Sequence, residues 1–127
     1  AVHADFFPDN VFFTGIILTG VIDFYFSCTD FFAYDLMLGL NAWCFTPDGA
    51  IDADRKNAFL AGYQKERPLA ATEKNALPFF GRCAALRIIA TRLYDWLNPV
   101  DGAQIRLKDP LEYVRILKFY QAGGFSA

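Results

Sequence analysis

The side chains best suited to chemistry lie at the start of the chain, in the stretch VHADFFPDNVFF, residues 2–13. This stretch contains the only histidine, His3, followed by Asp5 and Asn10 among hydrophobic neighbours. A second acid, Asp23, follows two β-branched residues. Phosphoryl transfer to an alcohol needs a carboxylate near the hydroxyl and oxygen ligands for magnesium. Asp5 suits the first task, and Asn10 and Asp23 suit the second.

The same residues also allow a simpler interpretation, in which they only tie a loop together. The pattern H-x-D-x-x-x-x-N arises often by chance, and it becomes specific when Asp23 follows at hairpin distance. A hairpin that folds back between Asn10 and Asp23 would bring both side chains toward one point. We predict that His3 hydrogen-bonds to loop backbone or to the Asp23 region and orients the loop, rather than transferring a proton.

The composition indicates one folded domain or part of one. The chain has 127 residues, of which 54% are hydrophobic, and a net charge of −2. This charge gives no case for nucleic acid as a partner. The longest apolar run is too short and too interrupted to span a bilayer, and no signal peptide is visible. We therefore expect a cytoplasmic protein without a membrane partner.

Two further features of the composition carry predictions. The three cysteines, Cys28, Cys44 and Cys83, are far apart with mostly apolar neighbours, which is typical of buried, reduced thiols rather than a zinc site. The 14 phenylalanines are many for a small domain, so part of this apolar surface is expected to serve a partner surface.

The pattern of apolar runs predicts a fold that is α+β and mostly α. Short runs at residues 10–13, 16–18 and 21–22, broken at Thr14-Gly15 and Thr19-Gly20, indicate a β-hairpin. Four helices are expected to follow, with turns at residues 46–49 and Asp101-Gly102. The helices are expected at about 31–45 (capped by Thr29 or Asp30), at 52–67 (started by Asp52 and ended before Pro68), from Thr72 to about 98 (with Pro78 placing the true start near Leu77), and from Asp109-Pro110 to about 121 (ended by Gly123-Gly124).

Three stretches carry a family resemblance: HADFFPDNVFF, GVIDFYFSCTDFFAYDLMLGLNAWCF and ALRIIATRLYDWLN. They resemble the bacterial homoserine kinases of the aminoglycoside/choline-kinase-like phosphotransferase superfamily, from Ala1 to about Gln121. The superfamily usually has glycine where this chain has Ala4 and Asp9, and Tyr25 replaces the glycine of protein kinases. These departures favour a small-molecule kinase. The resemblance implies a protein-kinase-like fold, ATP and Mg2+ as cofactors, homoserine as acceptor, and a place in threonine biosynthesis.

The resemblance also implies roles for individual residues. Asp5 would be the catalytic base that meets the homoserine hydroxyl, and Asn10 and Asp23 would hold magnesium. Asp35 matches an aspartate that the superfamily places at a helix start under the catalytic loop. The alternative for Asp35 is ordinary stabilisation of a helix dipole from the first turn, and the two roles are compatible.

The substrate of such an enzyme has a carboxylate, which favours arginine, and an ammonium, which favours acids or ring faces. The long helix offers Arg87, Arg92, Asp95 and Trp96. Arg87 and Arg92 do not share a helix face, so at most one is expected to point at substrate. The alternative is an arginine that only covers apolar surface, or an Arg92–Asp95 pair along the helix.

The glycine-rich G-x-G-x-x-G loop that covers ATP phosphates in such kinases does not occur in this sequence. We therefore expect residues 1–127 to form the C-terminal lobe only, without the N-terminal ATP-covering lobe. This piece would have little or no activity and would expose an apolar face, through which it could self-associate. Two alternatives stay open: a kinase of choline, an aminoglycoside, methylthioribose or another small alcohol, and a non-catalytic helical module.

Overall fold

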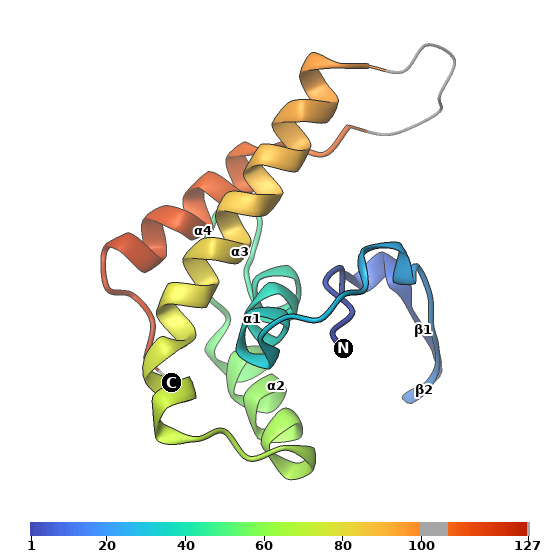
Figure 1. Ribbon diagram of the computed structural model, residues 1–127, viewed down its shortest axis with the longest axis vertical. Helices are drawn as coiled ribbons and strands as arrows, with labels where there is room; N and C mark the ends of the chain where they lie inside the picture. The colour runs from blue at the N-terminus through green and yellow to red at the C-terminus, as the bar shows by residue number, and fades with distance from the viewer. Residues whose placement is uncertain (100–106, 127) are drawn as a thin grey trace.

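The computed structural model describes residues 1–99 and 107–126. In this part of the chain a loop and a small hairpin precede four α-helices, so the predicted fold class is confirmed (Figure 1). The elements are the 3-10 helix η1 (Pro8–Asn10), the strands β1 (Val11–Thr14) and β2 (Ile17–Val21), the 3-10 helix η2 (Phe24–Phe26), and the helices α1 (Phe32–Trp43), α2 (Ala53–Glu66), α3 (Ala71–Leu97) and α4 (Leu111–Gln121).

The predicted hairpin is present, but its second arm is one continuous strand. β1 pairs antiparallel with β2, and the turn between them contains Gly15, which has a φ of 62°. The register shifts between Phe12 and Phe13, and Thr19 is the extra residue of the resulting bulge. The Thr19-Gly20 step, predicted as a break, is therefore accommodated inside the strand.

The first helix is confirmed, with differences at both ends. α1 begins after Phe31, so the predicted cap at Thr29 or Asp30 is wrong; the Asp30 side chain instead accepts a hydrogen bond from the Phe31 backbone N–H at 2.7 Å. The helix ends at Trp43 rather than near Phe45, because the chain enters an isolated antiparallel bridge there.

The second and fourth helices follow their predicted boundaries. Asp52 caps α2 by accepting a backbone hydrogen bond from its first turn at 3.0 Å, and Arg67, the residue before proline, ends the helix in an extended conformation. Asp109 accepts a backbone hydrogen bond at the start of α4 at 2.8 Å, and Gly123 follows the end of this helix with a φ of 74°. The turn predicted at Asp101-Gly102 lies outside the described residues.

The long helix α3 runs through Pro78, so the predicted start near Leu77 is wrong. The helix follows Ala70, whose backbone N–H donates to the Glu73 carboxylate at 3.0 Å. Pro78 removes one intrahelical hydrogen bond, but Leu77 is fully buried beside it. Packing of this helix against α1 and α4 therefore outweighs the local preference of proline.

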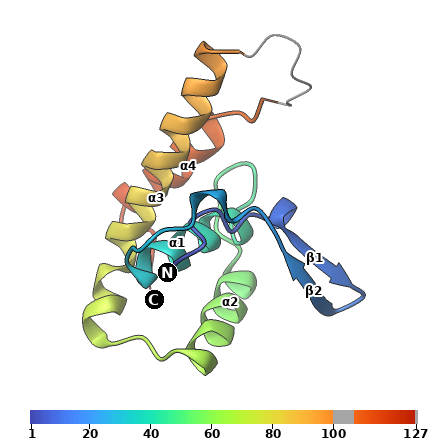
Figure 2. The ribbon, with the colours of Figure 1, turned by 45° about the vertical axis from the view of Figure 1, so that its right-hand side comes forward.

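The core lies where α3 packs against α1 on one side and α4 on the other. Figure 1 shows α3 and α4 side by side, while the hairpin projects away from the helices, as Figure 2 also shows. No helix within the described ranges is long and apolar enough to cross a membrane. Large apolar side chains of the hairpin and η2 are exposed: Phe12, Phe13, Ile16, Ile17, Leu18, Phe24, Tyr25 and Phe26.

The cysteines match their prediction only in part. Cys44 is buried, and burial raises the pKa of its thiol to about 11. Cys83 is half-buried, but Cys28 is exposed, so the prediction of burial is wrong for Cys28. Cys28 lies in the segment that pairs with the N-terminal loop, where backbone hydrogen bonds join it to Val2 in an antiparallel bridge.

A buried polar network ties the three core helices together. Asn41 of α1 is only 2% exposed, and it accepts a hydrogen bond from the Tyr120 hydroxyl of α4 at 2.7 Å. Its amide nitrogen donates to the Gly81 carbonyl of α3 at 3.0 Å. A methyl group at position 81 would lie 2.4 Å from the Tyr120 ring, so the close approach of these helices needs glycine there.

Replacement of Tyr120 by phenylalanine tests this network. Tyr120→Phe keeps the ring but leaves the buried Asn41 carbonyl oxygen unpaired, so we expect the free energy of unfolding to fall by about 1–3 kcal/mol in urea titrations. The matched control is Tyr94→Phe, because Tyr94 is 67% exposed. Equal stability of the two variants would contradict the structural role of the network.

Candidate active site

The loop that contains His3, Ala4 and Asp5 is held from below by Asp35, in the first turn of α1. One carboxylate oxygen of Asp35 accepts the His3 backbone N–H at 3.2 Å, and the other accepts the Ala4 N–H at 2.7 Å. A carboxylate that accepts two backbone hydrogen bonds fixes the position and the orientation of the loop backbone relative to α1. This is the contact that the predicted supporting role of Asp35 requires.

Arg87 of α3 holds the same loop from the other side. Its guanidinium donates to the Ala4 carbonyl oxygen and stacks over the Phe26 ring, 4.9 Å from the centroid. Ala4 has a φ of 62°, a left-handed conformation that costs a non-glycine residue about 1–2 kcal/mol. The hydrogen bonds that Asp35 accepts from Ala4 and its neighbour, and the one that Arg87 donates to Ala4, sustain this conformation.

His3 connects the loop to the end of the hairpin. Its Nδ1 accepts the Asp5 backbone N–H at 3.2 Å, which leaves the proton on Nε2, and Nε2 lies 2.9 Å from the Ile22 carbonyl oxygen. Ile22 directly precedes Asp23, so this neutral tautomer fixes the distance between the segments that carry the two acids. Both contacts belong to the kind predicted for an orienting histidine.

Asp5 and Asn10 are in direct contact. The Asn10 amide nitrogen donates to the Asp5 carboxylate at 3.2 Å and to its backbone carbonyl at 2.9 Å. Burial raises the pKa of the Asp5 carboxyl, and the charge of Asp23 acts in the same direction, while Arg87 and the Asn10 hydrogen bond oppose them. Because the Asn10 nitrogen faces Asp5, its carbonyl oxygen points elsewhere and is available to a cation.

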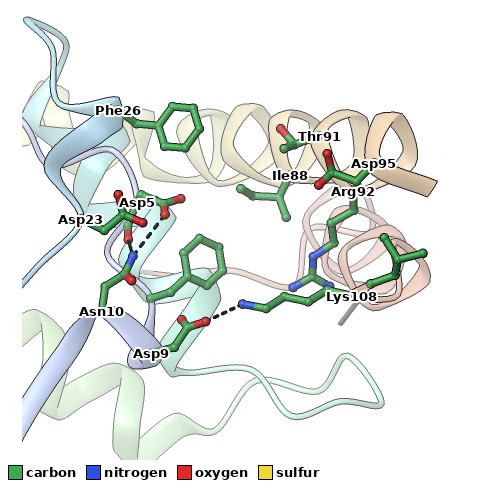
Figure 3. A pocket seen from close by; sticks show the side chains of 12 residues that line it. Asp5, Asp9, Asn10, Asp23, Phe26, Ile88, Thr91, Arg92, Asp95 and Lys108 are labelled. Atoms are coloured by element: carbon green, nitrogen blue, oxygen red, sulfur yellow. Dashed lines mark hydrogen bonds and ion pairs between the residues drawn. The ribbon is translucent and has the colours of Figure 1, made fainter. Parts of the chain in front are cut away.

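Asp23 completes the acidic end of the site. It has a φ of 62°, and the non-glycine residues with positive φ in the described part of the chain are Ala4 and Asp23. Such backbone conformations cluster at functional sites. Figure 3 shows Asp5, Asn10 and Asp23 together at one end of a cleft. The described residues contain no group of three His, Cys, Asp or Glu side chains arranged for a metal, so the set is two carboxylates and one amide.

The cleft has a volume of about 400 Å³ and lies between the loop, the hairpin end and α3. Its opposite end carries Arg92, Asp95 and Thr91 of α3, together with Lys108 (Figure 3). Phe7, Phe26 and Ile88 provide apolar walls between the two ends. The site therefore has two carboxylates and an amide at one end and both cations and acids toward the other, separated by hydrophobic surface.

The four substrate residues predicted on the long helix have different surroundings. Arg92 and Asp95 line the cleft. Arg92 pairs with Glu112 at 2.8 Å, which is not the Arg92–Asp95 pair considered as an alternative from the sequence. Arg87 is engaged with the loop, and Trp96 is half exposed; neither is among the side chains lining the cleft.

Sequence reasoning missed two charged residues of the cleft, Asp9 and Lys108. They form an ion pair at 2.7 Å, and Lys108 lowers the pKa of the Asp9 carboxyl through this hydrogen bond. The only signal in the sequence was Asp9 itself, an acid at a position where the resembling superfamily usually has glycine. Lys108 is remote in sequence, and its approach to the loop depends on the return of the chain after α3.

Comparisons with known proteins point to one family. Residues 1–69 match the family described as "Phosphotransferase enzyme family". The chain is similar to curated homoserine kinases of Xanthobacter autotrophicus (57% identical over 121 residues, 95% of this chain and 38% of the relative) and of Azorhizobium caulinodans (58% identical, with the same coverage). It is also similar to one of Rhizobium etli (54% identical over 126 residues, 99% of this chain and 39% of the relative). The chain thus spans about 38% of the length of the first two relatives.

Replacement of Asp35 separates its two candidate roles. Asp35→Ala removes both acceptors for the loop, so we expect amide hydrogen exchange of His3 and Ala4 to lose protection, with a loss of about 1–3 kcal/mol in stability. Asp54→Ala is the control, because Asp54 is also an acid in the first turn of a helix. Unchanged exchange at His3 and Ala4 in Asp35→Ala would leave only the dipole role.

Proposed function

Since the chain belongs to the phosphotransferase enzyme family, we propose that it is the C-terminal lobe of an ATP-dependent homoserine kinase. The observation that carries this proposal is the meeting of Asp5, Asn10 and Asp23 at one end of a single cleft. The names of the curated relatives, homoserine kinases at 53–58% identity, support homoserine as the acceptor. The product would be O-phosphohomoserine, made on the way to threonine.

In the proposed reaction Asp5 accepts the proton of the acceptor hydroxyl while the hydroxyl oxygen attacks the γ-phosphorus of ATP. The new bond joins this oxygen to phosphorus, and the bond between the γ-phosphorus and the bridging oxygen of ADP breaks. Desolvation raises the pKa of Asp5, which makes its carboxylate a better proton acceptor at neutral pH. His3, Asp35 and Arg87 act as positioning residues for the loop that carries Asp5.

Asn10 and Asp23 are the residues that we propose to hold magnesium. Carboxylate and amide oxygens form the hard donor set that Mg2+ prefers, and the orientation of Asn10 leaves its carbonyl oxygen for this purpose. When bound, the ion supplies positive charge beside the phosphates. Asp95, at the other end of the cleft, is proposed to face the ammonium of the amino acid, and Arg92 lines the cleft beside it.

The exposed hairpin has a place in this proposal. Its side chains and those of η2 offer apolar surface beside the cleft. We propose that an N-terminal ATP-covering lobe packs against this surface and that residues 1–127 without it have little activity. In the chain alone the same surface would favour self-association, and a monomer at every concentration in light scattering would exclude this.

The acceptor is tested with a chimera in which this chain replaces the matching part of the Xanthobacter homoserine kinase. The proposal expects ATP-dependent phosphorylation of homoserine in preference to choline, aminoglycosides and methylthioribose. A preference for one of the other alcohols would keep the chemistry and change the substrate. Loss of all kinase activity in a folded chimera would favour the non-catalytic helical module.

Replacement of Asp5 tests the base within the same chimera. Asp5→Asn keeps the size of the side chain but removes the proton acceptor, so we expect kcat to fall by about 100- to 10,000-fold with the fold intact by circular dichroism. Asp54→Asn, on the solvent side of α2, is the matched control and should leave kcat unchanged. Normal turnover by Asp5→Asn would remove the base assignment.

The metal site can be tested without activity, by using Mn2+ as a paramagnetic probe for the 127-residue chain. We expect Mn2+ to broaden the amide resonances around Asn10 and Asp23 in NMR spectra, and Mg2+ to reverse the effect by competition. Asp23→Asn should weaken this binding about tenfold or more, because the one carboxylate of the proposed ligand pair is lost. Broadening that persists unchanged in Asp23→Asn, or that centres on α2, would contradict the assignment.

A further inference from the structure

Charged groups line both ends of the cleft. Asp5 and Asp23 lie at one end, Arg92 and Asp95 lie at the other, and the Lys108 side chain extends to Asp9 (Figure 3). An acceptor whose hydroxyl lies near Asp5 needs a cation farther along the cleft for its acid. The question is then which of the two cations is able to take up the acid.

Arg92 is already committed to the protein. Its side chain is only 11% exposed, and it pairs with Glu112 at 2.8 Å. The same nitrogen donates to the Asp109 carbonyl oxygen at 2.6 Å, and the guanidinium stacks over the Tyr113 ring at 4.6 Å. These contacts hold the Arg92 side chain in place and neutralise its charge. Arg92 therefore forms part of the cleft wall and is poorly suited to bind the carboxylate of an acceptor.

Lys108 has the opposite character. Its side chain is 52% exposed, and its ion-pair partner Asp9 is 60% exposed. Exposed ion pairs contribute only about 0–1 kcal/mol, so another carboxylate can replace Asp9 at little cost. The ammonium also lies 5.4 Å from the centre of the Phe7 ring, which lines the same cleft. Lysine presents a flexible point charge that can follow an incoming anion.

Asp9 shows what this part of the cleft accepts. Its carboxylate sits 2.7 Å from the Lys108 nitrogen. The Asp9 carboxylate thus occupies the place that the carboxylate of an acceptor would take. Asp9 directly precedes Asn10 in the sequence. An acceptor that binds there has to displace Asp9 from Lys108, which makes Asp9 an internal competitor.

We propose that Lys108 binds the carboxylate of the acceptor in exchange for Asp9 and so selects hydroxy acids over plain amino alcohols. This inference rests on the proposed function, because it takes the acceptor to be an amino acid. It adds two residues, one on each side of the cleft, whose substitutions have opposite effects. Loss of Lys108 weakens carboxylate binding, and loss of the Asp9 charge strengthens it.

The experiment measures binding to the 127-residue chain by NMR titration with three small molecules. L-homoserine has both charged groups, 4-hydroxybutanoate lacks the ammonium, and 3-amino-1-propanol lacks the carboxylate. We expect Lys108→Met to weaken homoserine and 4-hydroxybutanoate about tenfold and to leave 3-amino-1-propanol unchanged. Asp9→Asn should strengthen the two carboxylates by about two- to fivefold. Lys118→Met, an exposed lysine of α4, is the control and should change nothing.

Several results would overturn the inference. These are equal weakening of all three molecules by Lys108→Met, no strengthening by Asp9→Asn, or no binding of homoserine by the wild-type chain. A Lys108→Met variant that loses binding of inorganic phosphate but keeps 4-hydroxybutanoate would assign the lysine to the phosphoryl group instead. The chimera distinguishes failure of the Lys108 assignment from failure of the proposed function. If the chimera phosphorylates homoserine while Lys108→Met binds homoserine normally, only the Lys108 assignment fails. A folded chimera that does not phosphorylate homoserine refutes the proposed function.

Discussion

The carboxylate of Asp35 accepts two successive backbone N–H groups, and the geometry of the cleft depends on this interaction. It holds Ala4 in a left-handed conformation that alanine does not favour, and Arg87 secures the carbonyl oxygen of the same residue. Asp5 follows directly, so its direction is set by groups on α1 and α3 rather than by its own loop. A loop that is held from two helices of the core is more rigid than its lack of regular structure suggests.

His3 extends the same support to the hairpin. Because its Nδ1 accepts a hydrogen bond from the backbone of Asp5 and its Nε2 reaches the carbonyl of Ile22, one imidazole sets the spacing of two segments. Asp5 and Asp23 are thereby kept near each other although their charges repel. A cation between them would relieve this repulsion, which is a physical reason to place magnesium at this end of the cleft.

The distribution of charge also explains why two similar cations have different roles. Arg92 is buried against Tyr113 and neutralised by Glu112, as a guanidinium in a protein interior must be. Lys108 keeps its ammonium in contact with water and with one exposed acid. Of the two cations, Lys108 makes the more exposed ion pair, which is why we propose it as the partner of the acceptor carboxylate.

Local sequence determined much of this protein. The candidate triad of Asp5, Asn10 and Asp23 came from the H-x-D-x-x-x-x-N spacing followed by Asp23 at hairpin distance. The cap at Asp52, the helix start at Asp109-Pro110, the stop before Pro68 and the hairpin between Asn10 and Asp23 follow from short-range rules. These features could be predicted because each depends on neighbours a few residues away.

Only the tertiary structure decided the rest. Pro78 stays inside α3 because burial of Leu77 and its neighbours outweighs a lost hydrogen bond. Arg92 pairs with Glu112 rather than Asp95, and Lys108 reaches Asp9, because the chain returns along α3 and brings remote charges together. Ion-pair partners of this kind depend on proximity in the folded structure, which cannot be predicted from their separation along the sequence.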